Sequence, residues 1–163
     1  MASTNAHNRQ PITRLTEFGA TYFLTWRIAP NQPTLTAAER DLVANTLRHF
    51  ENSRYTLHAW VVMDDHVHVV VTPVAPATMD AISHSWRTFT ALALVRDFGR
   101  TAPIWQRGRH DRVVRAGGEF DEKILYVRQN PWRRWPECLD YAAPAAGKRP
   151  SFSSCFRRWR GPM

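Results

Sequence analysis

Cysteine is scarce in this sequence of 163 residues: Cys138 and Cys155 lie near the C-terminal end, without C-x-x-C spacing. Neither a disulfide framework nor a cysteine zinc site is indicated, and a reducing cytoplasmic setting fits best. Long apolar runs are also missing, since no segment reaches the roughly 18 residues that a membrane-spanning helix needs. Residues 1–11 are polar, unlike the apolar core of a secretion signal. We therefore expect neither membrane insertion nor secretion.

Acidic residues are scarce in the second part of the chain. Residues 100–163 hold fourteen basic and six acidic side chains, whereas residues 1–99 hold eight of each, so the second part supplies the whole net charge of +8. Such a basic block favours a polyanionic partner, because Lys and Arg displace the counterions condensed on a phosphate backbone. Twenty of the 22 basic residues are arginine, which suits phosphate binding but is also enriched by a GC-rich genome.

Apolar residues are abundant enough for a folded domain. They make up 44% of the chain and include seven Trp and eight Phe, which argues against intrinsic disorder. After Tyr141 the composition shifts to Ala, Pro, Gly, Ser and Arg, with five basic side chains and no acidic one. We therefore expect one domain over residues 20–140, between an N-terminal arm (1–19) and a basic, flexible tail (141–163).

The first pattern along the domain is a strand followed by a helix. Ala20–Ile28 is rich in aromatic and β-branched residues and precedes a proline-containing turn, which predicts a strand. Thr36 and Glu39 stand at the spacing of a capping box, and apolar residues follow at helical intervals. This pattern predicts a helix over residues 36–51.

Two strongly β-prone segments come next. Tyr55–Met63 and His66–Thr72 are separated by Asp64 and Asp65 alone, which predicts a hairpin of long, largely buried strands. We expect this pair to form the centre of the sheet.

Periodicity and helix-breaking residues define the rest of the domain: a helix from Met79 to Gly99, an extended stretch over Ile104–Arg115 interrupted by Gly108, and a helix after Gly117 that ends at Asn130-Pro131. No internal repeat is present. This order of elements predicts an α+β fold, a ferredoxin-like antiparallel sheet with helices on one face plus an added C-terminal helix that carries Tyr126.

His66 and His68 are alternate residues of a predicted strand, so both imidazoles project from the same face. Two such histidines can clamp a metal ion, although strand histidines are more often ordinary polar residues without a ligand. A third ligand is needed before a metal site is indicated.

Tyr126 and Asn130 are four residues apart on the third predicted helix, about 40° around its axis, so both emerge on one flank. A structural explanation is available for both residues. Tyr126 would then pack on the sheet edge, and Asn130 would cap the helix ahead of Pro131.

Three motifs change that balance: WVVMDDHVHVVV (60–71), IWQRGRHDRVV (104–114) and YVRQNP (126–131). Together they resemble the single-tyrosine HUH transposases of the IS type, and most closely the REP-associated tyrosine transposases. SWRTFT (85–90) and NPWRRWPE (130–137) also resemble that subgroup. The resemblance covers residues 20–140.

The resemblance implies a site. His66 and His68 become paired metal ligands, Asn130 the third ligand and Tyr126 the nucleophile, with Asp65 orienting His66. Neutral ligands of this kind suit Mg²⁺ or Mn²⁺ completed by water and substrate phosphate. The sequence departs from the family pattern at two positions: Asp64 stands where proline is common, and Arg112 where histidine is frequent. Neither change removes a residue that the chemistry requires.

The implied activity is metal-dependent cleavage and joining of single-stranded DNA through a covalent 5′-phosphotyrosine, at palindromic repeats that form hairpins. The family contains both dimers and monomers, so a homodimer is left open. Guanidinium groups hold phosphates and indoles stack on bases, and the candidate DNA-binding residues are Trp105, Arg107, Arg109, Arg112, Arg128, Trp132, Arg133 and Arg134.

Two alternatives stay open at this point. A non-catalytic nucleic-acid-binding module or repressor would keep the fold and the basic tail, and would use Tyr126 for stacking. A histidine-dependent hydrolase of small phosphate esters would explain the metal ligands, but it leaves the basic block and Tyr126 without a purpose.

Overall fold

The computed structural model describes residues 19–136. The tail expected over 141–163 and all but the last residue of the arm expected over 1–19 lie outside this range. The described part contains these elements in chain order: β1 (Thr21–Arg27), α1 (Ala37–Arg48), β2 (Tyr55–Val62), β3 (His66–Pro73), α2 (Met79–Phe98), β4 (His110–Val114) and α3 (Gly118–Arg134). Among these residues, no helix has the length and apolar character needed to cross a membrane.

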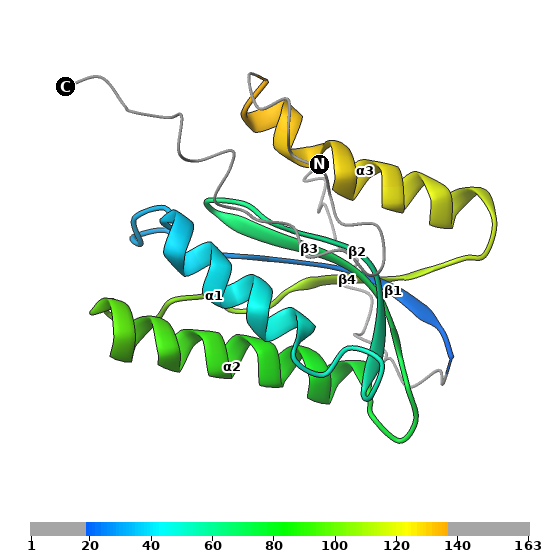
Figure 1. Ribbon diagram of the computed structural model, residues 1–163, viewed down its shortest axis with the longest axis horizontal. Coiled ribbons are helices and arrows are strands. Elements are labelled where there is room, and N and C mark those ends of the chain that lie inside the picture. Colours follow the sequence, from blue (N-terminus) through cyan, green and yellow to red (C-terminus); the bar gives the residue numbers. More distant parts are fainter. Residues whose placement is uncertain (1–18, 137–163) are drawn as a thin grey trace, which may run out of the picture.

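The four strands form one antiparallel sheet in the order β2-β3-β1-β4. Helices α1 and α2 cover one face of it, and α3 crosses the opposite face (Figure 1). The predicted α+β fold, with its added C-terminal helix, is confirmed. Strands β1 and β3 occupy the centre, so the prediction that the hairpin forms the centre is wrong for β2. That strand has the apolar sequence of a central strand because α3 and α1 pack on its two faces.

Alternate residues of the strands pack into two separate hydrophobic cores, one on each face of the sheet. Leu24 of β1 and Val69 of β3, neither exposed, face α1 and α2 in the larger core. Val61 of β2, Val70 of β3 and Val127 of α3 form the smaller core on the other face. The strand period of two thus divides β3 between both layers, and it leaves His66 and His68 on the same face as Val70.

The helix ends follow the sequence signals in two of the three helices. Thr36 caps α1 and accepts a hydrogen bond from the Glu39 backbone N–H, while the Glu39 carboxylate accepts one from Thr36, so the predicted capping box is present. Gly99 ends α2 in the left-handed conformation, with φ of 68°, which glycine adopts without the usual penalty.

The structure corrects two of the predicted boundaries. The expected extended stretch over Ile104–Arg115 forms a strand over His110–Val114 alone, because Gly108 has φ of 83° and breaks the pairing; Trp105 keeps an isolated bridge to Ile28. Helix α3 continues through Pro131 to Arg134 instead of ending at Asn130-Pro131. Pro131 cannot donate to the preceding turn, but its ring is buried, and this packing offsets the lost hydrogen bond.

A buried ion pair fixes α1 to the loop that follows α2. The guanidinium of Arg100 contacts both carboxylate oxygens of Glu39, and the two side chains are 6% and 4% exposed. Arg100 also donates to the carbonyls of Pro33 and Thr34. Burial alone would raise the pKa of Glu39, but the hydrogen bonds from Arg100 and Thr36 outweigh burial, and the pKa lies below 4.5. The loop after α2 is therefore held rigidly against the start of α1.

We expect Glu39→Gln to lower the free energy of unfolding by about 3 kcal/mol at neutral pH, because the change leaves the buried Arg100 without a counter-charge. The carboxylate pKa is lower in the folded state, so its stabilisation is present above pH 4.5 and is lost as the pH falls through the folded pKa. Urea unfolding from pH 3 to pH 7 should show the two proteins converging in acid. Asp97→Asn, which breaks the exposed pair with Arg96, is the matched control and should change little. A constant difference at all pH values would contradict this assignment.

Candidate functional site

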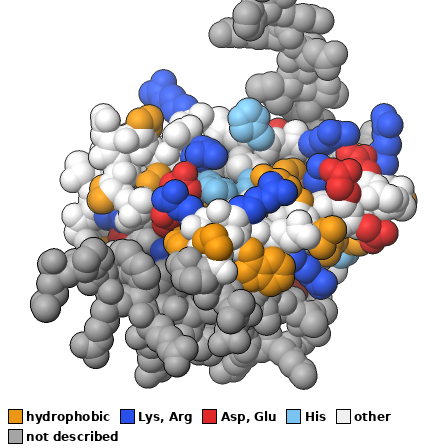
Figure 2. Space-filling view, turned by 90° about the horizontal axis from the view of Figure 1, so that it is seen from above, with side chains coloured by type: hydrophobic (Ala, Val, Ile, Leu, Met, Phe, Trp, Pro, Cys, Tyr) orange, Lys and Arg blue, Asp and Glu red, His pale blue; other side chains and the backbone are white. Residues whose placement is uncertain are grey.

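The candidate site lies on the face of the sheet that α3 crosses. His66 and His68 of β3 project from this face, and their pairing partners on β1 are Arg27 and Thr25. Seen from the α3 side, histidine surface lies near the middle of this face, between Lys and Arg side chains (Figure 2). The strand register therefore brings polar groups of β1 and β3 together beneath the helix.

Hydrogen bonds fix the orientation of the His66 ring. Its Nδ1 lies 2.5 Å from Asp65 Oδ1, and the other carboxylate oxygen of Asp65 accepts from Arg27 Nη1 at 3.1 Å. Burial would raise the pKa of Asp65, but the hydrogen bond from His66 and the charges of His66, Arg27 and Arg134 hold it below its ordinary value. Nε2 of His66 points at Asn130 Oδ1, 3.2 Å away. Asp65 thus stands where it can orient His66, as the resemblance implies.

His68 is held by Thr25 in a similar way. Its Nδ1 lies 2.7 Å from Thr25 Oγ1, and the His66 and His68 ring centroids are 4.6 Å apart. Burial, followed by the neighbouring charge of His66, lowers the pKa of His68 to about 3. The imidazole is therefore neutral at physiological pH, as a metal ligand must be.

Tyr126 reaches the histidines from α3. Its ring makes edge contacts with His68, at 5.3 Å between centroids, and with Phe23, at 5.9 Å. The Arg133 guanidinium lies 5.3 Å from the ring centroid. Asn130 is one turn further along the helix and is 7% exposed. The structure thus brings Tyr126 and Asn130 together with His66 and His68, four residues that the sequence places on two separate elements.

The donor atoms of these residues are of a kind that can bind a divalent metal ion. Both Nδ1 atoms have partners, which leaves the two Nε2 atoms and the Asn130 amide oxygen as candidate ligands. Within residues 19–136, no group of three or more His, Cys, Asp or Glu side chains is placed to hold a metal, so the amide oxygen is needed to complete the set. Two imidazoles and one amide leave an ion with open positions for water and phosphate, and the expected choice of Mg²⁺ or Mn²⁺ stays a prediction.

Five of the candidate DNA-binding residues lie on the same side of the sheet as Tyr126. Four of them are exposed on α3: Arg128, Trp132, Arg133 and Arg134. Arg134 donates to Asp64 at 2.9 Å, and Arg112 of β4 pairs with Glu119 at 2.6 Å. Their surroundings are compatible with contact to an anionic strand, and their roles stay predictions.

Three other candidates lie apart from this cluster. Trp105 is 7% exposed in the larger core, where its indole N–H donates to Thr90 Oγ1 at 3.0 Å. Arg109 forms ion pairs with Asp80 of α2 and with Asp111. Arg107 is exposed on the loop between them. The structure therefore does not bring these residues to Tyr126.

Sequence reasoning missed the contribution of β1. Phe23 stacks on His68 at 5.4 Å between centroids, Thr25 holds the same ring, and Arg27 holds Asp65. These residues alternate along a predicted strand, which is a usable signal for a shared face. No local pattern shows which strand lies opposite these residues. Thr25 and His68, for example, are 43 residues apart in the sequence.

We expect Thr25→Val to lower the free energy of unfolding by about 1–2 kcal/mol, because the buried Nδ1 of His68 loses its hydrogen-bond partner. Urea unfolding measures the change, and ¹⁵N NMR of the imidazole should show a shift in the tautomer of His68. Thr56→Val, at an exposed position of β2, is the control and should leave both quantities unchanged. An unaltered tautomer in Thr25→Val would contradict the contact.

Comparison with known proteins gives a likeness at the level of structure. No family model matches the sequence, and no curated protein matches it significantly. A REP-associated tyrosine transposase bound to a REP hairpin superposes with a TM-score of 0.64 at 18% identity, over 77% of this chain and 74% of the other. A transposase candidate from Deinococcus radiodurans R1 superposes with a TM-score of 0.52 at 16% identity, over 74% of this chain and 97% of the other. The chain therefore has the fold of a REP-associated tyrosine transposase, as the sequence resemblance implies.

Proposed function

We propose that the protein is a metal-dependent single-stranded DNA endonuclease and strand transferase that cuts through a covalent 5′-phosphotyrosine. The observation that carries this proposal is the meeting of Tyr126 with the His66, His68 and Asn130 donors on one face of the sheet. Phosphodiester transfer by tyrosine requires a nucleophile close to the metal ligands. Here the ring of the nucleophile contacts the ring of one proposed ligand directly.

The chemical step follows from this arrangement. The phenol oxygen of Tyr126 attacks the phosphorus, a tyrosine–phosphate bond forms at the 5′ end of the downstream strand, and the bond from phosphorus to the 3′ oxygen of the upstream strand breaks. The phenol proton is released, and the leaving oxygen gains a proton to become a 3′-hydroxyl. Because the phosphotyrosine conserves the energy of the ester, a 3′-hydroxyl can reverse the step and join strands without ATP.

His66, His68 and Asn130 would hold the ion, whose contribution is to offset the charge of the scissile phosphate. The protein keeps these donors ready without it: Asp65 and Thr25 occupy the Nδ1 atoms, so the rings need not reorient. Phe23 and His68 contact the Tyr126 ring and limit its rotation. The chain thus supplies orientation before the substrate arrives.

The charge near Tyr126 supports a nucleic-acid substrate. Arg133 lies over the Tyr126 ring, and Arg128 and Trp132 extend along the exposed side of α3. Cations on the nucleophile's own helix favour the approach of a phosphate. The structural relative that carries a REP hairpin leads us to propose hairpin-forming palindromic repeats as the substrate.

We expect Tyr126→Phe to abolish the covalent adduct, because no other residue of the site can form a phosphotyrosine. The measurement is a denaturing gel of the protein mixed with a 3′-labelled single-stranded oligonucleotide copied from palindromes beside its gene, with and without Mg²⁺ or Mn²⁺. The label must be at the 3′ end because the protein is linked to the 5′ end of the product.

Leu125→Ala is the matched control for this experiment, since Leu125 is the neighbouring residue of α3 and is 54% exposed. It should form the adduct at the wild-type rate. An adduct in Tyr126→Phe would overturn the proposed nucleophile. Metal-independent binding with no adduct in any protein, over several hairpin sequences, would support a non-catalytic DNA-binding module on the same fold.

A further inference from the structure

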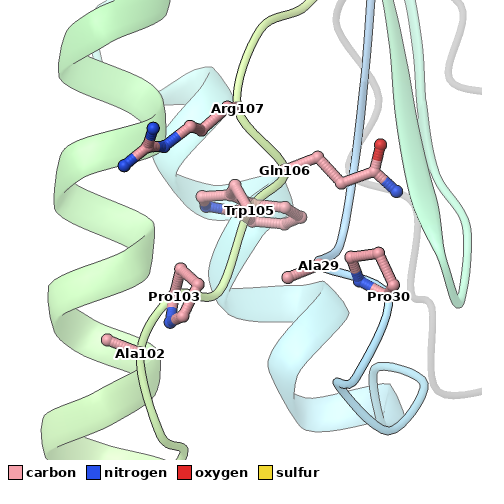
Figure 3. A pocket seen from close by; sticks show the side chains of 7 residues that line it. All are labelled: Ala29, Pro30, Ala102, Pro103, Trp105, Gln106 and Arg107. Atoms are coloured by element: carbon pink, nitrogen blue, oxygen red, sulfur yellow. The ribbon is translucent and has the colours of Figure 1, made fainter.

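A second concave feature lies beyond the end of β1, away from Tyr126. It is an open cavity of about 790 Å³, and its walls include Pro30, Pro103, Trp105, Gln106 and Arg107 (Figure 3). Two proline rings and an indole edge give it apolar sides, while Gln106 and Arg107 add polar groups. A cavity of this volume, with apolar walls and few polar groups, is typical of a small-ligand or nucleotide site.

This groove lies at the end of β1, the strand that pairs with the histidine-bearing β3. The backbone N–H of Gln106 donates to the carbonyl of Arg27 at 2.9 Å, and Trp105 bridges to Ile28. Arg27 is the pairing partner of His66, and its side chain donates to Asp65. The groove therefore begins at the end of β1 that lies beside His66.

The groove segment presents different groups to its two sides. In the extended stretch around Gln106, the side chain of Arg107 points toward α2, whereas that of Gln106 points away from this helix (Figure 3). The backbone hydrogen bond of Gln106 to Arg27 keeps the segment in this alternation.

Arg87 of α2 adds an uncompensated charge next to the groove. Its side chain is partly buried, and its Nη2 donates to the Gln106 carbonyl at 2.5 Å. Within the described residues it forms no ion pair with a carboxylate, and its buried Nε has no hydrogen-bond partner. Burial, followed by the charge of Arg109, lowers the pKa of Arg87. A partly buried cation without a counterion is costly, and an anion bound here would remove that cost.

The neighbouring arginine differs in this respect. Arg109 is matched by two carboxylates, Asp80 and Asp111, so its charge is already neutralised. Arg107 is exposed at the rim of the groove and makes none of the ion pairs found in residues 19–136. Arg87 and Arg107 are therefore the two guanidinium groups beside the groove that an incoming anion can pair with.

We propose that this groove binds one nucleotide of the DNA single strand outside the cleavage site, with Arg87 and Arg107 holding its phosphate. The two prolines and the Trp105 edge pack against its sugar and base. This inference rests on the proposed function, since it assigns a part of the same DNA substrate to a second site. It also gives a role to the SWRTFT motif, whose arginine lies far from Tyr126.

The groove is built to keep its shape. Gln32 donates to the carbonyls of Thr101 and Pro103, and the buried pair of Arg100 with Glu39 fixes the start of the same loop. A wall held in this way loses little entropy when a nucleotide binds. The groove and the histidines thus form two rigid points along one path for a single strand.

The test measures binding of fluorescein-labelled dT12 without added metal, so that cleavage cannot contribute. We expect Arg107→Ala to weaken binding about tenfold at 0.1 M salt. The slope of log K against log salt should decrease by about 0.7, as expected for one lost phosphate contact. Arg87→Met should act in the same direction, and Arg107→Lys should restore the salt slope because it keeps the charge. Arg96→Ala removes an exposed charge from α2 outside the groove and should bind like the wild type.

The stability of Arg87→Met is first checked by urea unfolding. If Arg87→Met is not folded, the test uses Arg107→Ala alone, because Arg107 is exposed on a loop and its replacement should not disturb folding. If the wild type binds dT12 and Arg107→Ala behaves like Arg96→Ala, the groove is not a DNA site, while the adduct experiment on Tyr126 keeps its own outcome. If the wild type binds neither dT12 nor hairpin oligonucleotides, the proposed function fails and this inference fails with it.

Discussion

The pairing of β1 with β3 is the constraint on which the rest of the site depends. Antiparallel register sets Thr25 opposite His68 and Arg27 opposite His66, and the strand period of two then sends all four side chains to one face. A slip of one residue in β3 would move the imidazoles into the apolar core beneath α1 and α2, where Leu24 of β1 offers no hydrogen bond. The apolar alternation of β3 therefore fixes the chemistry as well as the core.

Helix α3 completes the site by packing its apolar side on the sheet. Val127 is fully buried in one cluster with Val61 and Val70. This contact fixes how α3 is rotated about its axis, and therefore where the residues on either side of Val127 point. Tyr126 is about 100° around the axis from Val127, and Asn130 is three residues further on, which places both beside the sheet. Pro131 does not end the helix, and it is buried within α3. The last turn of α3 therefore extends to Arg133, whose guanidinium reaches the Tyr126 ring.

Local patterns predicted a large part of this fold. The capping box at Thr36, the end of α2 at Gly99 and the hairpin at Asp64-Asp65 are each specified within a few residues, and the structure confirms them. What the sequence could not show is which elements meet. The position of β2 at the sheet edge and the separation of Trp105 from Tyr126 both depend on long-range packing. Resemblance supplied the grouping of His66 with the α3 residues, since no spacing in the chain contains it.

Desolvation explains why the polar groups of the site are so fully paired. A buried imidazole without a partner would cost free energy, so each Nδ1 is held by a neighbouring oxygen, from Asp65 or from Thr25. The two Nε2 atoms are thereby left as the groups that can act on something outside the protein. Arg87 has the opposite status, since its charge lacks a partner among the described residues. Pairing at the histidines and its absence at Arg87 therefore suit the two different roles that we propose for them: donors oriented for an ion in one place, and a charge that an anion would neutralise in the other.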